Sequence, residues 1–194
     1  MLNQVWGKVF SARLIREHQL EFPLEMWGED RLFFFSVLER AKKVAVISDP
    51  LYRYIQQKNS LISRFLPNKA KVCARIHREV TALAEKKGAV SKESDEIFSY
   101  MYVKSLLSVL ATLYSPSCPF SFGQKRRFVK EVLAQPEIGC LKSAPLSAGK
   151  GFALLFALLK TKNVTLNLMA AWGMKLVSRT LPGLFRKQKH IYNK

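Results

Sequence analysis

The stretch NKAKVCARIHREVTALAEKKG (68–88) is followed by a second patterned stretch, SDEIFSYMYVKSLLSVLATLY (94–114). In both, apolar residues recur every three or four positions, which is the spacing of one face of an α-helix. We predict two helices here. The first ends at Gly88, and the second begins after an N-cap at Ser94, with Asp95 and Glu96 in its first turn.

Shorter helices are predicted on either side of this pair, over residues 11–18, 29–41 and 124–134, with Ser11 as an N-cap. Between the second of these and the central pair, KKVAVISDPLYRY (42–54) contains a β-branched run that predicts a strand over 44–47. The order helix, strand, extended segment fits the closing portion of an α/β domain. We therefore predict an α/β part over 1–65 and a mostly helical, basic region over 66–194.

The positive charge is concentrated towards the end of the chain. The formal net charge is +18, and residues 123–194 carry 14 Lys and Arg against 2 acidic residues. No acidic residue follows Glu137. A polycationic segment of this kind indicates an anionic partner, such as nucleic acid, phospholipid head groups or a phosphorylated substrate.

An amphipathic segment is predicted at about 151–185. On a helix, Asn167, Ala171 and Lys175 form a narrow polar stripe, and a wider apolar face lies beside it. Lysines interrupt the segment too often for a membrane-spanning helix, which needs about 20 mostly apolar residues. Two interpretations stay open: a helix packed on its own domain, or a helix lying in the plane of a membrane interface. The apolar face comprises Leu166, Met169, Trp172, Gly173, Leu176 and Val177.

Cysteine usage indicates a reducing compartment. Cys73, Cys118 and Cys140 are widely spaced and fit neither a zinc pattern nor an even disulfide framework. We therefore expect free thiols and a cytoplasmic location.

Two adjacent carboxylates, Glu29 and Asp30, stand between Trp27-Gly28 and a triple phenylalanine in WGEDRLFFF (27–35). Acidic residues in the first turn of a helix interact favourably with its dipole, by about 0.3–1 kcal/mol, and need no catalytic role. The alternative is that one carboxylate accepts a proton from a substrate hydroxyl.

The motifs around this pair shift the balance towards catalysis. Five short motifs follow one another over about 60 residues: Trp6-Gly7-Lys8-Val9-Phe10, Leu20-Glu21-Phe22-Pro23, Gly28-Glu29-Asp30, Ala41-Lys42-Lys43-Val44 and Pro50-Leu51-Tyr52-Arg53-Tyr54. In this order and spacing they resemble the second half of the catalytic domain of bacterial family 2 glycosyltransferases.

This resemblance implies a remnant of a GT-A-type α/β fold. It also implies the transfer of a sugar from a nucleotide-sugar to a glycan or lipid-linked acceptor, with inversion, in cell-surface glycan synthesis. Asp30 would be the general base and Glu29 a positioning group. Trp6, Lys8, Trp27 and Gly28 would line the substrate site.

Two departures from the family pattern matter. Where the family carries arginines after the tyrosines, this chain has Ile55 and Gln57. The nucleotide-binding half and its Asp-x-Asp, which holds Mg²⁺ or Mn²⁺, would precede Trp6, and this chain contains no Asp-x-Asp. We therefore expect the chain alone to bind no metal through such a motif and to be incomplete as an enzyme.

The expected partners are a nucleotide-sugar, a glycan or lipid-linked acceptor, and an anionic membrane surface reached through the C-terminal segment. The expected location is the inner face of a bacterial plasma membrane. Two alternatives stay open: a nucleic-acid-binding protein, which the charge permits although no recognition motif is apparent, and a non-catalytic membrane-surface module. No nucleic acid is expected under the leading interpretation.

Overall fold

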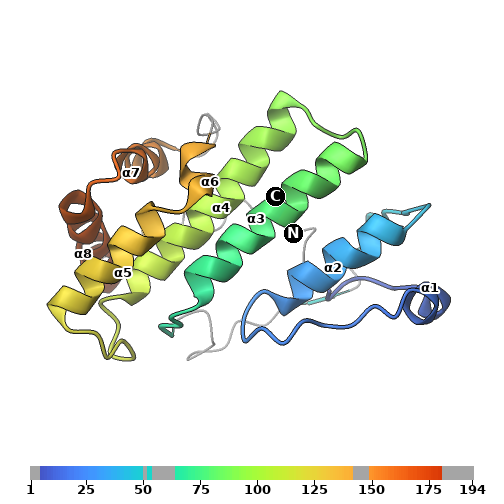
Figure 1. Cartoon of the computed structure of the whole chain (residues 1–194), viewed down its shortest axis with the longest axis horizontal. Coiled ribbons are helices and arrows are strands. Elements are labelled where there is room, and N and C mark those ends of the chain that lie inside the picture. The colour runs from blue at the N-terminus through green and yellow to red at the C-terminus, as the bar shows by residue number, and fades with distance from the viewer. Residues whose placement is uncertain (1–4, 50–51, 54–63, 142–148, 181–194) are drawn as a thin grey trace.

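A computed structural model describes residues 5–49, 52–53, 64–141 and 149–180, and its architecture is helical (Figure 1). Two long helices, α3 and α4, run side by side through the middle of the molecule. Helices α1 and α2 lie on one side of this pair, and α5 to α8 lie on the other. The elements are α1 (Ala12–Glu17), α2 (Glu29–Arg40), α3 (Lys69–Lys86), α4 (Lys92–Thr112), α5 (Phe122–Leu133), α6 (Pro136–Gly139), α7 (Lys150–Lys160) and α8 (Val164–Thr180).

The predicted α/β remnant is wrong. Helices account for 64% of the described residues, and none of those residues belongs to a strand. The predicted strand over 44–47 lies within the described part of the chain and forms no ladder. Val44, Val46 and Ile47 are instead 65%, 82% and 62% exposed.

The physical reason is that a strand is stabilised by a neighbour. An extended segment satisfies its backbone N–H and C=O groups through a second strand, and its β-branched side chains gain stability by packing on a sheet face. The run 44–47 has no such neighbour among the described residues. Its composition favours extended backbone but cannot by itself build a sheet.

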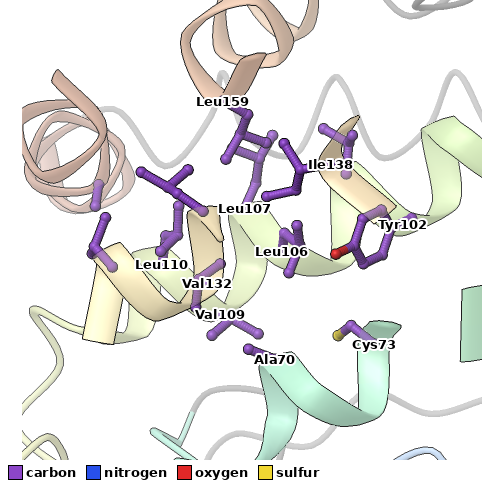
Figure 2. Close-up of a cluster of buried hydrophobic side chains, with 14 of the residues drawn as sticks. Ala70, Cys73, Tyr102, Leu106, Leu107, Val109, Leu110, Val132, Ile138 and Leu159 are labelled. Carbon is purple, nitrogen blue, oxygen red and sulfur yellow. The ribbon is translucent and has the colours of Figure 1, made fainter. Parts of the chain in front are cut away.

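The main core lies where α4 meets α3 on one side and α5 to α8 on the other (Figure 2). Val103, Leu106, Val109 and Leu110 of α4 are at most 1% exposed. Their spacing places them on the apolar face that the sequence predicted. Figure 2 shows Val132, Ile138 and Leu159, which come from α5, α6 and α7, converging on the same cluster.

A second, smaller core joins α2 to α3. Leu32 and Phe35 of α2 pack with Val72 and Ile76 of α3. Trp27 packs against both cores, so the two clusters are bridged by one indole ring. The division of the chain at residues 65 and 66 is not tested by these contacts and stays a prediction.

Helix boundaries follow the capping chemistry closely. Ser11 caps α1 as predicted, because its Oγ accepts from the Leu14 N–H at 3.3 Å. The predicted cap at Ser94 is wrong: α4 begins earlier, at Lys92, with Ser91 as its N-cap. Ser91 and Ser94 form a reciprocal capping box, in which each side chain accepts from the other's backbone N–H. Ser94 is therefore the third helical residue rather than the cap.

Replacing Leu106 tests the main core. Leu106→Ala should lower the free energy of unfolding by about 2–5 kcal/mol, because it leaves a cavity in a fully buried site. Chemical denaturation followed by circular dichroism measures this. Ile97→Ala on the same helix is the matched control, since Ile97 is 54% exposed and should change stability by less than about 0.5 kcal/mol. Equal losses in the two variants would contradict this packing.

Candidate functional site

Gly28 sets the geometry at the start of α2. It is the N-cap of the helix and adopts a left-handed conformation with φ of +86°. A Cβ atom at this position would lie 2.8 Å from Ile76 Cδ1 and 3.2 Å from Val72 Cγ1. Only glycine both adopts this backbone conformation and permits α2 to approach α3 so closely. This packing explains the glycine, and the role of Gly28 in substrate binding stays a prediction.

The carboxylates Glu29 and Asp30 occupy the first turn of α2, where both are half-buried. Asp30 Oδ1 accepts a hydrogen bond from the Arg31 backbone N–H at 2.8 Å. Gly28 has no side chain to cap the helix, so acidic groups in this turn provide the negative charge that the N-terminal dipole favours. The helix dipole and this hydrogen bond thus account for the carboxylate pair without a catalytic role. The catalytic interpretation stays open, because a carboxylate has further lone pairs to accept a substrate proton.

Trp27, the residue before Gly28, lies close to two cations. The Arg31 guanidinium carbon is 5.2 Å from the centre of the indole ring, and Lys69 Nζ is 4.7 Å from it. Both distances fall within the range of a cation–π contact. Trp27 therefore contacts two cations in addition to packing against both hydrophobic cores. It helps to hold two positive charges beside the first turn of α2.

Lys69 is buried, at 2% exposure, although it carries a charge. Its Nζ is 3.4 Å from Ser108 Oγ of α4, so one hydrogen bond supplements the contact with Trp27. Burial lowers the pKa of Lys69, and the nearby Arg31 charge lowers it further. Burial also lowers the pKa of Arg31, while the charge of Asp30 raises it. Asp30 thus partly compensates the charge of Arg31.

The N-terminal segment brings Lys8 to the same region. Lys8 Nζ lies 4.7 Å from the centre of the Phe34 ring on α2. Burial lowers the pKa of Lys8, and the charge of Asp30 raises it, so the two residues interact electrostatically. Trp6 is half-buried. The next residue, Gly7, lies near Tyr52: a Cβ atom added to Gly7 would be 3.6 Å from Tyr52 Cβ.

Sequence reasoning missed Arg31 and Lys69. Arg31 directly follows the carboxylate pair, and Lys69 stands on the apolar row of α3, three and four positions before Val72 and Cys73. A lysine on an apolar helix face was a usable signal, because a buried ammonium requires a partner. Its partner, Trp27, is distant in sequence and is found only in the folded chain.

The described part of the chain contains no group of three or more His, Cys, Asp or Glu side chains that could hold a metal ion. Asp30 lies in the first turn of α2 and Asp95 in the first turn of α4. The described residues therefore contain no carboxylate cluster that would hold Mg²⁺ or Mn²⁺. A pocket of about 210 Å³ lies elsewhere, between α5 and α8, and neither Glu29 nor Asp30 lines it.

Comparison with known proteins gives one relative, described as "Putative glycosyltransferase EpsH", from Bacillus subtilis (strain 168). It is 24% identical over 168 residues, which cover 78% of this chain and 46% of that protein. This chain thus spans less than half of the relative's length. No known family description matches the chain, and no solved structure matches it. The similarity supports a distant relationship to glycosyltransferases, but it does not specify family 2 or a GT-A fold.

Replacing Gly28 tests the close approach of α2 to α3. Gly28→Ala should destabilise the protein by about 1–2 kcal/mol through its positive φ and by about 1–3 kcal/mol more through overpacking against Ile76. Gly88→Ala is the matched control: its φ is +63°, but nothing lies within 4 Å of the added Cβ. Thermal or chemical unfolding compares the two. The contact is disproved if both variants lose the same stability.

Thiol labelling tests the environment of Cys73, which is buried on α3 one turn after Lys69. Burial raises the pKa of Cys73 to about 12, so roughly one in ten thousand of these groups is a thiolate at pH 8. In the folded protein, a thiol reagent should modify exposed Cys140 rapidly and Cys73 only after unfolding. Raising the pH towards 10 should increase the Cys73 thiolate fraction about tenfold per unit. Mass spectrometry of the labelled peptides would show the opposite order if the placement were incorrect.

Proposed function

We propose that this chain provides the acceptor side of a family 2 glycosyltransferase-type protein, and that Asp30 is its general base. The observation that carries the proposal is the similarity to the B. subtilis protein, which extends over 78% of this chain. The arrangement of Asp30 beside Lys8 and Arg31 is compatible with it. The α/β remnant is no part of the proposal.

In the proposed step, the acceptor hydroxyl donates its proton to an Asp30 carboxylate oxygen. The hydroxyl oxygen forms a bond to the anomeric carbon of the donor sugar as the bond from that carbon to the nucleoside diphosphate breaks. Attack from the face opposite the leaving group inverts the configuration. A free alcohol is a weak nucleophile, so removal of its proton during attack lowers the barrier, typically by a factor of about 10²–10⁴.

Lys8, Arg31 and Lys69 would favour an anionic substrate near this base. Their three positive charges exceed the two negative charges of Glu29 and Asp30, so the region retains positive character that suits a phosphate group. Trp27 holds two of the cations and supplies an apolar surface next to them. Glu29 would position the acceptor.

Replacing Asp30 tests the base. The assay uses a chimera in which this chain replaces the matching 46% of the B. subtilis protein, supplied with a panel of nucleotide-sugars. Asp30→Asn should lower kcat at least about 100-fold while KM changes little, because the amide cannot accept the proton. Asp95→Asn is the matched control: it removes a first-turn carboxylate from α4, outside the candidate site, and should retain most of the activity.

Full activity in the Asp30→Asn chimera would refute the base assignment but leave sugar transfer intact. An inactive chimera that nevertheless binds nucleotide-sugar and folds normally would contradict the proposed transfer itself. Circular dichroism of each variant separates these results from misfolding.

A further inference from the structure

The face of α8 that packs on the bundle contains Asn167 and Ala171 of the predicted polar stripe, together with the buried apolar residue Leu168. Asn167 is 1% exposed and Ala171 is not exposed at all. The Asn167 side-chain amide donates to the Leu158 carbonyl at 2.8 Å and to the Asn163 carbonyl at 2.9 Å. The amide is thereby satisfied inside the protein, and the predicted polar face is the one that turns inward.

The opposite face of α8 is apolar and faces solvent. Met169 and Trp172 are 63% and 56% exposed, and their neighbours on the same face are exposed too. Helix α7, which contacts α8, also exposes an apolar side chain, Leu154 at 62%, and carries Lys150 and Lys160 at its two ends. We call this exposed surface the α7–α8 face. On α8 it comprises Leu166, Met169, Trp172, Leu176 and Val177.

The pocket of about 210 Å³ lies between α5 and α8, and two residues of this face, Met169 and Trp172, line it. Met169 and Trp172 form one wall, Phe122 forms another and is 68% exposed, and Arg126 adds a cation. Tyr114 also lines the pocket, and its hydroxyl donates to the Leu168 carbonyl at 3.4 Å. The combination of apolar walls with a cation fits an anionic amphiphile.

The positive charge of the C-terminal part of the chain indicates which class of partner this face binds. The last 72 residues, 123–194, carry 14 basic residues against 2 acidic ones. Next to the pocket, Lys125 Nζ lies 4.8 Å from the Tyr114 ring centre. A second copy of the chain carries the same formal net charge of +18, so electrostatic repulsion disfavours pairing of two copies through this face. An anionic phospholipid interface supplies both the negative charge and the apolar layer that this face lacks.

We propose that the α7–α8 face seats the protein on an anionic membrane surface, with Met169 and Trp172 inserted among the acyl chains and Arg126 near the phosphates. Within the described ranges, no helix is both long and apolar enough to traverse a bilayer. At about 1.5 Å per residue, α8 is roughly 25 Å long and lies in the membrane plane. The attachment is independent of sugar transfer, because none of these residues belongs to the Asp30 site.

Vesicle co-sedimentation of the full chain tests this proposal. Vesicles of phosphatidylcholine with about 30% phosphatidylglycerol should bind at least about tenfold better than phosphatidylcholine alone. Met169→Ser/Trp172→Ser should weaken binding at least about tenfold. The matched control is Val90→Ser/Ile97→Ser, which removes side chains that are 53% and 54% exposed elsewhere. Arg126→Gln should weaken binding, whereas Lys92→Gln on α4 should not.

A second measurement does not depend on a destabilising change. Brominated acyl chains should quench the wild-type tryptophan fluorescence, and Trp172→Phe should bind equally well but lose most of the quenching. The proposal is overturned if the double variant binds vesicles as well as the wild type. It is also overturned if the wild type ignores vesicles and instead dimerises through Trp172, as light scattering would show, or binds a single-stranded oligonucleotide in a salt-sensitive manner.

Discussion

The packing of α4 against α3 is the contact on which the other elements depend. Residues at most 1% exposed, such as Leu106 and Leu110, give α4 an apolar surface broad enough to serve partners on both sides. On one side it fixes α3, which in turn receives α2 through Val72 and Ile76. On the other side it receives α5, α6, α7 and α8. Without this helix neither the carboxylate turn nor the exposed apolar face would have a support.

The helices were predictable because their signals are local. Apolar spacing of three and four positions and a capping serine each lie within a few residues of the element they define. The strand predicted over 44–47 does not form, because β structure requires a partner strand that local composition cannot supply. The cap of α4 was misplaced by three residues for a related reason. Ser91 and Ser94 cap reciprocally, and either serine fits the pattern for a single cap.

The orientation of α8 shows a second limit of local reasoning. Periodicity correctly separates its two faces, but it does not say which one turns inward. Asn167 can be buried because two backbone carbonyls lie within reach of its amide, and only the folded turn between α7 and α8 provides them. The same limit applies at the candidate site. Gly28, Glu29 and Asp30 were found from their motif, while Lys69 became visible only through its long-range contact with Trp27.

Trp27 has a mechanical consequence for the site beside it. Its indole ring packs against both cores, and Gly28 then brings α2 to within van der Waals contact of α3. Moving α2 away from α3 would expose apolar surface from both cores at once, which is unfavourable because the burial of that surface stabilises the fold. The turn that carries Asp30 is therefore held rigidly by packing and does not act as a hinged lid. Any closure over a substrate has to come from a segment that moves towards it.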